Sequence, residues 1–335
     1  MKIGTLDTKD NVFIIAEIGN NHEGSYALAE EMIGLAAESG ADAVKFQTII
    51  PEKLVSSLET QRIKQLRRFQ LTYGEFEKLE KVATNENVIF LSTPFDINSA
   101  LFLNGLVLAF KIASGDNDFF PLIEIIARTG KPIIMSTGLM EIEEVRKSAD
   151  FIRRIWQENG IIQELALLHC VSIYPTPHSE VNLLAIKQLE GIVRTVGYSD
   201  HTLGIEAAVL SVALGAKIIE KHFTLDKNHS DFRDHGLSAD PEEMRELVHR
   251  VRCASQYLGN GKKVVFDDEK KIIKENRRSI VAARDLSVGH GITMDDLNWV
   301  RPADGLSPGS ERQLLGKSLS RVLKKGEKIL LKDIK

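Results

Sequence analysis

Short apolar runs alternate with longer amphipathic segments along most of this chain. Runs rich in Val, Ile, Leu and Phe are typical of parallel strands that are buried on both faces. Between them, apolar residues recur at the spacing of one helix face, notably over 26–40, 72–86, 142–160, 205–215 and 241–258. Strands that alternate with helices predict a parallel sheet made of β–α units. The expected strands are 12–19, 42–48, 87–94, 108–115, 132–138, 165–172, 193–200 and 216–223.

The number and spacing of these units predict a closed barrel. Eight strand–helix pairs spread over about 250 residues are typical of the (β/α)₈ TIM barrel. The competing arrangement is a doubly wound open sheet, but no G-x-G-x-x-G follows the first strand. We therefore expect an α/β chain whose residues 1–258, after a short N-terminal extension, form a (β/α)₈ catalytic barrel.

The pattern changes near residue 259. Residues 259–277 are charged and rich in turn formers, and we interpret them as a linker with one exposed helical stretch. Residues 278–335 carry short strands and tight turns, and they predict a small β-rich domain that is marginally stable alone. Within it, Thr293 and Asp296 have the spacing of a capping box. No internal repeat is visible.

Composition excludes several classes of partner. The chain has 335 residues, 43% of them hydrophobic, and a formal net charge of −4. This charge does not favour nucleic acid or an anionic membrane as a partner. No apolar run reaches the length of a membrane span, and the first residues have no hydrophobic signal core, so we expect a cytoplasmic protein. Cys170 and Cys253 are far apart in sequence and suit reduced thiols.

Two of the apolar runs lead into histidines that lie in polar clusters. GIVRTVGYSDHT leads to His201, and ALGAKIIEKHFT leads to His222. Because α/β proteins keep their chemistry at the carboxyl ends of strands, these two imidazoles could share one divalent cation. Asp200, Glu220 and water could complete its coordination. The alternative is a pair of buried histidines with purely structural hydrogen bonds.

Two lysines interrupt apolar strands. Lys45 and Lys111 are costly to bury without an anionic partner, and hydroxyl residues follow the neighbouring strands. A bound phosphate and carboxylate would supply that partner. The alternative is a structural salt bridge to Glu17. Gln47 points to the same side as Lys45 because side chains in a strand alternate.

Loops after the later strands carry further candidates. Pro175 and Pro177 stiffen the loop that presents Tyr174, which could contact a substrate. The charged loop after the last strand brings residues 233–235 (Arg, Asp and His) near the histidine pair, and its length suits a loop that covers a substrate. We interpret Cys170 as a small buried residue rather than a nucleophile.

The motifs AEIGNNHEG, VKFQT, STPFD, KIASGD, STG, LHCVSIYPTP, YSDHT and EKHFT occur in this order. The ordered set resembles the sialic acid (N-acetylneuraminate) synthase family. The segment from RRSIVAARDLSVGHG onward resembles the antifreeze-like (β-clip) domain that closes those enzymes. This resemblance implies condensation of phosphoenolpyruvate with an N-acylated aldose such as N-acetylmannosamine. The product would be a nine-carbon 2-keto sugar acid, formed with release of phosphate.

The resemblance also implies roles for particular residues. Glu17, Glu220 and His222 would be catalytic, and His201 and His222 would hold a divalent metal, with Mn²⁺ expected and Mg²⁺ or Co²⁺ as alternatives. The sugar would be bound by Gln47, Tyr174, Asp234 and, from the small domain, Arg301. Phosphoenolpyruvate would be bound by Lys45, Thr93, Lys111, Ser114, Ser136, Ser172 and Ser199.

Three departures from the family pattern bear on these roles. Ser172 stands where some members have Asn, and Asp116 stands where others have Glu. Residues 232–233, Phe-Arg, replace a Gly-Pro pair just before Asp234. The bulkier pair leads us to expect a sugar other than plain N-acetylmannosamine, or one that is turned over with modest efficiency.

Two other functions remain open at this point. One alternative is an aldolase that forms a Schiff base through Lys111 or Lys221. The other is a carbohydrate- or ice-binding protein without catalysis. For the synthase we expect a domain-swapped homodimer, because the small domain gains stability by docking and the linker is long enough to reach a neighbouring subunit.

Overall fold

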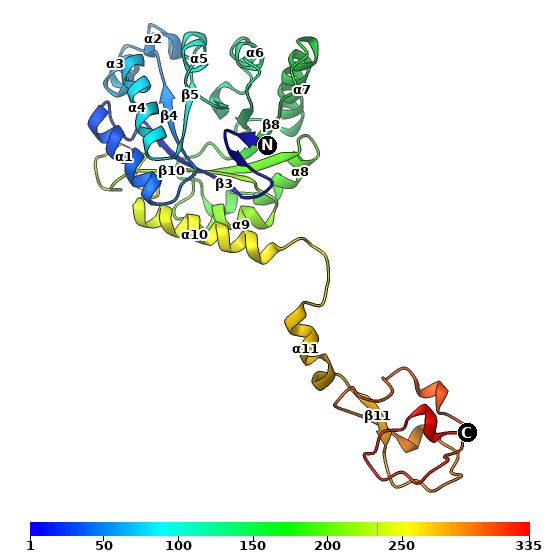
Figure 1. Ribbon diagram of the computed structural model, residues 1–335. Coiled ribbons are helices and arrows are strands. Elements are labelled where there is room, and N and C mark those ends of the chain that lie inside the picture. The colour runs from blue at the N-terminus through cyan, green and yellow to red at the C-terminus, as the bar shows by residue number, and fades with distance from the viewer. Residues whose placement is uncertain (233) are drawn as a thin grey trace. The chain divides into compact units, whose positions relative to one another are not determined.

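The structure is a computed structural model, and it describes residues 1–232 and 234–335. The chain divides into two compact units, Met1–Gly259 and Asn260–Lys335 (Figure 1).

The first unit is built on one sheet of parallel strands. The order of neighbours is β5-β4-β3-β10-β9-β8-β7-β6, and the outermost pair, β5 and β6, also lie next to each other. The sheet thus forms a nearly closed barrel, which confirms the expected architecture. Its strands are β3 (Phe13–Gly19), β4 (Ala43–Thr48), β5 (Ile89–Pro94), β6 (Phe110–Ile112), β7 (Ile133–Ser136), β8 (Leu165–Cys170), β9 (Thr195–Asp200) and β10 (Ile218–His222).

Helices follow each strand and cover the outside of the barrel (Figure 1). The apolar spacing predicted five of the outer helices. Three others, which have five to nine residues, were not predicted because their apolar faces are too brief to give a clear period. Two further helices, α2 (Pro51–Leu54) and α3 (Thr60–Phe69), lie between β4 and α4. The outer helices are α1 (Tyr26–Glu38), α4 (Tyr73–Asn85), α5 (Ile97–Leu103), α6 (Phe120–Arg128), α7 (Ile142–Glu158), α8 (Ile186–Glu190), α9 (Glu206–Ala213) and α10 (Pro241–Leu258).

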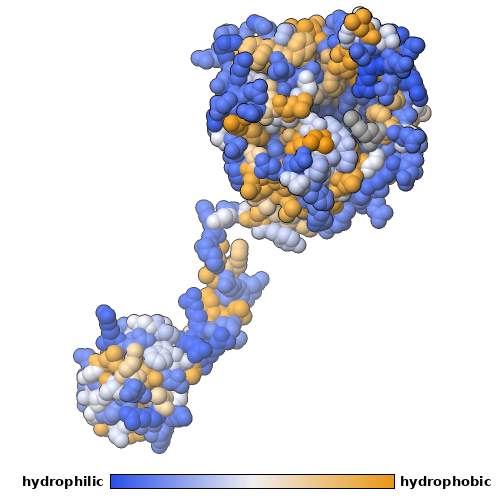
Figure 2. Space-filling view, turned by 180° about the vertical axis from the view of Figure 1, so that it is seen from behind, coloured by the Kyte–Doolittle hydropathy of each residue, from blue (hydrophilic) through white to orange (hydrophobic). Residues whose placement is uncertain are grey.

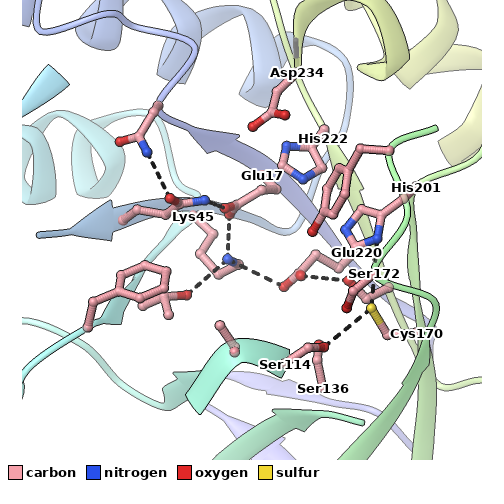
Figure 3. Close-up of a pocket in the computed structure, with 18 of the residues that line it drawn as sticks. Glu17, Lys45, Ser114, Ser136, Cys170, Ser172, His201, Glu220, His222 and Asp234 are labelled. Atoms are coloured by element: carbon pink, nitrogen blue, oxygen red, sulfur yellow. Dashed lines mark hydrogen bonds and ion pairs between the residues drawn. The ribbon is translucent and has the colours of Figure 1, made fainter. Parts of the chain in front are cut away.

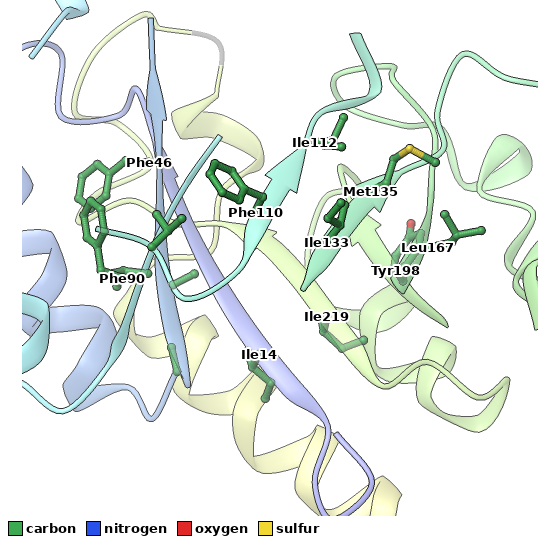
Figure 4. Packing of buried hydrophobic residues seen from close by; sticks show 14 of the residues in the cluster. Ile14, Phe46, Phe90, Phe110, Ile112, Ile133, Met135, Leu167, Tyr198 and Ile219 are labelled. Carbon is green, nitrogen blue, oxygen red and sulfur yellow. The ribbon is translucent and has the colours of Figure 1, made fainter. Parts of the chain in front are cut away.

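Alternation along the strands divides the buried side chains into two clusters. The larger one lies between the strands and the helices and includes Ile14, Phe46 and Phe90 (Figure 4). The rings of Phe46 and Phe90 stack with centroids 5.6 Å apart. The smaller cluster contains side chains of the opposite parity, such as Ile15 and Ile218, which fill the barrel interior. Burial on both faces explains why the strands read as continuous apolar runs.

An amino-terminal hairpin belongs to the interior cluster. Its strands are β1 (Lys2–Ile3) and β2 (Leu6–Asp7), and they pair antiparallel. Met1 and Ile3 are buried against the inward residues of the barrel strands. The pattern analysis treated this region as a polar extension, because two-residue strands leave almost no periodic signal.

Parallel register brings the polar strand ends together. Glu17 on β3 lies opposite Lys45 on β4, and Glu220 on β10 lies opposite Ser199 on β9. Each of these residues follows apolar residues of its own strand and therefore lies toward the carboxyl end of the barrel. Neighbouring strands thus supply the polar residues of one end of the barrel.

The second unit contains a helix and a small β-rich core. The helix is α11 (Asp267–Asn276), and β11 (Ser279–Ala282) pairs antiparallel with β12 (Leu297–Val300). The core includes Ile280, Leu286 and Leu323. The capping box formed by Thr293 and Asp296 is present as expected, because each side chain binds the backbone N–H of the other residue.

The second unit also contains an internal repeat that inspection of the sequence missed. Arg284 donates to Asp296 at 2.9 Å, and Arg321 donates to Asp333 at 2.8 Å, in matching turns. The two turns meet through Leu286 and Leu323, whose backbones exchange hydrogen bonds at 2.8 and 3.0 Å. The two copies share little beyond Arg, Leu, Gly, Ile and Asp at equivalent positions, so the repeat is hard to detect without the contacts.

On the face shown in Figure 2, hydrophobic residues form patches that hydrophilic residues separate. Within the described residues, none of the helices combines the length and the apolar character that crossing a bilayer requires.

Candidate active site

A pocket of about 570 Å³ opens at the carboxyl ends of the barrel strands. All eight strands or the turns that follow them contribute to its wall, as expected for a barrel enzyme. Every barrel residue to which the family resemblance assigns a role lines this pocket, whereas Arg301 belongs to the second unit. The candidates that line it are Glu17, Lys45, Gln47, Thr93, Lys111, Ser114, Ser136, Ser172, Tyr174, Ser199, His201, Glu220, His222 and Asp234.

Two buried lysines and two buried carboxylates form the floor of the pocket (Figure 3). Lys45 Nζ lies 2.6 Å from Glu17 Oε2 and 3.7 Å from Glu220 Oε2. Lys111 Nζ lies 3.7 Å from Glu220 Oε1 and donates to Ser136 Oγ at 2.7 Å. The salt bridge to Glu17 considered for Lys45 is therefore present. Because Lys45 also lines the pocket, this ion pair does not prevent it from meeting an anionic ligand.

The two carboxyl groups have different proton affinities. Burial raises the pKa of Glu17, and the charge of Glu220 raises it further, although Lys45 acts in the opposite direction. Burial alone would also raise the pKa of Glu220, but Lys111 and Lys45 together hold it well below its usual value. Unequal pKa values in one site are the usual basis for separate acid–base roles. Glu17 is the carboxyl better suited to carry a proton, and Glu220 is the one better suited to stay charged.

The two histidines lie side by side at the pocket wall, with ring centroids 5.4 Å apart. His201 Nδ1 lies 2.9 Å from the Val171 carbonyl oxygen, which fixes the ring and leaves Nε2 for a ligand. Burial lowers the pKa of His222 well below its usual value, and its Nδ1 has no hydrogen-bond partner among the described residues. The ring of Tyr174 lies against His201 with centroids 4.1 Å apart. Neutral imidazoles with available lone pairs are suitable metal ligands.

Asp200 does not face this pair, contrary to expectation. It shares its strand face with Tyr198, on the side packed against helices, and the Tyr198 hydroxyl donates to it at 3.1 Å. Lys221 Nζ lies 3.0 Å from its other oxygen. Among the described residues, no three His, Cys, Asp or Glu side chains are arranged to hold a metal. A cation at His201 and His222 would therefore keep open positions, which is typical of catalytic sites.

A group of hydroxyls lies beside the lysines and includes Ser114 and Ser172. A Cβ atom at Gly138 would collide with both hydroxyls in their present positions, so a larger residue there would have to displace them. Ser172 Oγ is buried and has no hydrogen-bond partner in the described part of the chain. Cys170 also lines the pocket, and its Sγ lies 3.5 Å from Ser114 Oγ. Gly138 and Cys170 are site residues that the sequence analysis did not assign.

The mouth of the pocket includes helix α3, which the sequence analysis overlooked. Arg62, Gln65, Leu66 and Phe69 of this helix line the pocket. Its apolar residues recur at positions 63, 66 and 69, and this spacing was the signal that could have identified the helix. The helix faces residues of the loop after β10, where Phe69 and Phe232 have ring centroids 4.9 Å apart.

The loop after β10 is only partly directed at the pocket. Asp234 and Phe232 line the pocket, as the sequence analysis expected of this loop, whereas His235 is buried and turned toward Thr224 and Glu23. Arg233 lies outside the described residues. Asp116, which departs from the family pattern, follows β6 and does not line the pocket; burial raises its pKa to about 6.

Comparison with known proteins agrees with this geometry. The model of the NeuB family matches residues 32–263, and that of the SAF domain matches residues 277–335. The N,N'-diacetyllegionaminic acid synthase of Legionella pneumophila is 40% identical, over 96% of this chain and 94% of that protein. The human N-acetylneuraminate-9-phosphate synthase is 32% identical, over 95% of this chain and 91% of that protein.

A solved structure shows the same fold. The N-acetylneuraminic acid (sialic acid) synthetase of Leptospira borgpetersenii, solved in complex with citrate, superimposes with a TM-score of 0.76. The two chains are 33% identical, and the match covers 82% of this chain and 94% of that one. These findings confirm the resemblance noted from the ordered motifs. The chain therefore belongs to the NeuB family of sugar acid synthases, and it carries a SAF domain at residues 277–335.

Proposed function

We propose that this enzyme condenses phosphoenolpyruvate with a neutral N-acylated aldose to form a nonulosonic acid and phosphate. The observation that carries the proposal is the floor of the pocket, where Lys45 and Lys111 lie beside hydroxyls and next to the paired imidazoles of His201 and His222. An anionic three-carbon substrate and a sugar aldehyde could meet there.

Phosphoenolpyruvate would bind over the two lysines. A phosphate and a carboxylate bring the negative charge that two buried ammonium groups favour. Thr93 and Ser136 already contact the lysines, at 3.1 and 2.7 Å, and could turn their hydroxyls toward the ligand. The unpartnered hydroxyl of Ser172 is a further donor, and Ser114 and Ser199 complete the proposed set.

The histidine pair would hold the divalent cation that this family generally uses, with Mn²⁺ expected and Mg²⁺ or Co²⁺ as alternatives. The free Nδ1 of His222 and the fixed ring of His201 support this assignment. Such a cation, when bound, supplies Lewis-acid polarisation of the sugar aldehyde.

The residues of the pocket could carry the reaction as follows. C3 of phosphoenolpyruvate forms the new bond to the aldehyde carbon, and the aldehyde oxygen takes up a proton. Positive charge develops at C2, where the anionic Glu220 could stabilise it. Water adds at C2 and loses one proton. Phosphate then departs with its bridging oxygen and takes up the proton of the new C2 hydroxyl, which becomes the 2-keto group. Glu17 is the proposed proton carrier because its pKa is raised.

The acceptor sugar would be neutral and N-acylated, held by Gln47, Tyr174 and Asp234. Leu66, Phe69 and Phe232 present apolar surface at the mouth, which suits acylamino or methyl substituents. The synthase of Legionella pneumophila named for a di-N-acetylated acid is 40% identical, compared with 32% for the human 9-phosphate synthase. A di-N-acylated sugar is therefore our first choice.

We further propose that residues 259–277 link the barrel to the small domain at 278–335, and that two chains exchange these domains in a homodimer. Arg301 would then contribute to the sugar site of a partner subunit. It is an exposed residue of the second unit. The cytoplasm, where phosphoenolpyruvate is produced, is the proposed compartment.

A panel of acceptors tests this function. Purified enzyme with Mn²⁺ and phosphoenolpyruvate is incubated separately with N-acetylmannosamine, its 6-phosphate and a di-N-acylated 6-deoxyhexose. We expect phosphate release and a product mass equal to sugar plus pyruvate, with the di-N-acylated sugar used best. Preference for the 6-phosphate would refute the neutral acceptor, and no product from any sugar would refute the condensation.

The Schiff-base alternative is tested by borohydride in the presence of pyruvate. Lys221 is paired with Asp200 and does not line the pocket, which leaves Lys111 as the candidate. We expect full activity after treatment. Covalent inactivation with a mass shift on Lys111 would instead identify an aldolase.

A further inference from the structure

Glu23 has an unusual backbone conformation beside the pocket. Its φ angle is 46°, in the left-handed region, which costs a residue other than glycine about 1 kcal/mol. The next residue, Gly24, is pressed against the backbone carbonyl of Arg68 near the end of α3, where a Cβ atom would collide. A strained residue of this kind persists only where the surrounding structure imposes its conformation, and the contacts of the Glu23 side chain are part of these surroundings.

The Glu23 carboxylate binds the loop after β10 at two points. Its Oε1 accepts a hydrogen bond from Ser230 Oγ and lies 3.1 Å from His235 Nε2. His235 is fully buried, and its Nδ1 lies 2.7 Å from Thr224 Oγ1. The same Ser230 hydroxyl accepts from the backbone N–H of Phe232 at 3.0 Å. The loop is thus held on both sides of residues 231–234.

Three residues between these two points line the pocket. Asp231, Phe232 and Asp234 are part of the pocket wall, whereas Glu23 itself is not. Phe232 also packs on Phe69 of α3, the helix against which Gly24 is pressed. The β3–α1 loop, α3 and the loop after β10 therefore hold one another in place at the mouth.

We propose that Glu23 is a positioning residue for the sugar. By holding Ser230 and His235, its carboxylate fixes Phe232 and Asp234 in the pocket wall before the sugar arrives. This inference rests on the proposed function, in which that loop binds the acceptor. Preorganisation of this kind lowers the cost of ordering a loop on binding and acts on the ligand that touches the loop. Phosphoenolpyruvate, bound over the lysines, does not depend on it.

The decisive variant is Glu23→Gly. Glycine adopts the left-handed conformation without strain, so the variant should fold, and a side chain with no role in the pocket wall predicts unchanged KM values. The positioning role predicts a folded enzyme whose KM for the sugar rises about 10- to 100-fold, since two charge-assisted hydrogen bonds to the loop are lost. The KM for phosphoenolpyruvate should stay within twofold.

A matched control and two milder variants complete the test. Asn87, in the turn before β5, is also left-handed, with φ 59°. Asn87→Gly relieves strain away from the pocket and should leave the KM for the sugar unchanged. Glu23→Gln keeps an oxygen acceptor and should recover part of the affinity, and Ser230→Ala should cause a smaller rise than Glu23→Gly. These two variants serve as the test if Glu23→Gly does not fold.

The outcomes separate this inference from the proposed function. If the wild-type enzyme forms no condensation product with any sugar, the proposed function fails. If it does form product, but Glu23→Gly, Glu23→Gln and Ser230→Ala all keep the wild-type KM for the sugar, the positioning role is wrong. Equal increases of both KM values would also overturn it, because the effect would then not be specific to the sugar.

Discussion

Lys45 and Glu17 form the shortest ion pair between the buried lysines and carboxylates of the pocket, with Nζ 2.6 Å from Oε2. They occupy facing positions of β3 and β4, so the parallel register itself brings them together. Both side chains are almost fully buried, yet both line the pocket. A buried pair that remains accessible to a ligand can exchange one anionic partner for another, and the first prediction follows from this property.

Replacing Lys45 with Met keeps the aliphatic stem and removes the charge. We expect the KM for phosphoenolpyruvate to rise by about 30- to 1,000-fold, which corresponds to roughly 2–4 kcal/mol for one buried charge-assisted contact. Lys111→Met should have a similar effect because Lys111 contacts Ser136 and faces Glu220. Steady-state kinetics at saturating sugar measures both. Wild-type constants in both variants would show that the anion binds elsewhere.

Replacing His222 with Ala should abolish metal-dependent turnover and leave the fold intact. His222 is neutral at physiological pH because burial lowers its pKa, so its removal leaves no buried charge unpaired. The affinity for Mn²⁺ should fall at least tenfold. The paramagnetic enhancement of water proton relaxation by bound Mn²⁺ measures this affinity. Chelation of the wild-type enzyme should give the same inactive state. If the variant is active, or if the wild-type enzyme keeps full activity after exhaustive chelation, the assignment of these histidines to a catalytic metal is wrong.

The small domain provides a prediction about pH. Burial alone would raise the pKa of Asp296, but hydrogen bonds from His290, the Thr293 backbone and Arg284 hold it far below its usual value. A lowered pKa in the folded state stabilises the fold above the unfolded pKa, and this stability is lost as the pH falls below about 4. Asp296→Asn should therefore destabilise the domain by about 2 kcal/mol at pH 7 and by somewhat less at pH 3, because the folded-state carboxyl takes up its proton only well below its usual pKa.

Hydrogen exchange of the β11 amides measures this stability in the intact chain. The exposed neighbour Asp295 provides the control, because Asp295→Asn should leave exchange unchanged at either pH. A destabilisation by Asp296→Asn that persisted undiminished at pH 3 would show that the carboxylate charge is not responsible.

The proposed exchange of small domains predicts complementation between two inactive variants. Arg301→Ala removes the residue offered to the partner, and His222→Ala disables the barrel that carries it. If the domains are exchanged, a mixed dimer contains one intact site and regains activity. If each small domain instead serves its own barrel, His222→Ala chains stay inactive and Arg301→Ala chains stay impaired in every mixture. Refolding the two variants together and separately, with phosphate release as the assay, distinguishes the two arrangements.

Much of the barrel could be predicted from the sequence because its strands are buried on both faces. Each expected strand contains the observed one, for example 165–172 around Leu165–Cys170. The polar residues at strand ends were also predictable, since Lys45 and His222 interrupt apolar runs. The N-terminal hairpin and α3 were not predicted, because their apolar signals are short or are masked by charged neighbours such as Arg67 and Arg68.

Side-chain direction was harder to predict than residue choice. Asp200 and His201 are adjacent in sequence, and a strand directs neighbours to opposite faces, so only one of them could face the pocket. The sequence pattern predicted both residues at the site. In the structure, Asp200 instead pairs with Lys221 on the side of the strands that packs against the helices. The part played by Glu23 depends on contacts across more than two hundred residues of chain, which no local pattern contains.

The fate of one oxygen atom tests the proposed reaction most directly. Phosphoenolpyruvate labelled with ¹⁸O at the bridge between C2 and phosphorus is consumed with the preferred sugar, and the released phosphate is analysed by mass spectrometry. Attack of C3 on the aldehyde followed by addition of water at C2 predicts that the phosphate carries the full label. Unlabelled phosphate would mean that the P–O bond breaks instead, and it would contradict the mechanism proposed for this pocket.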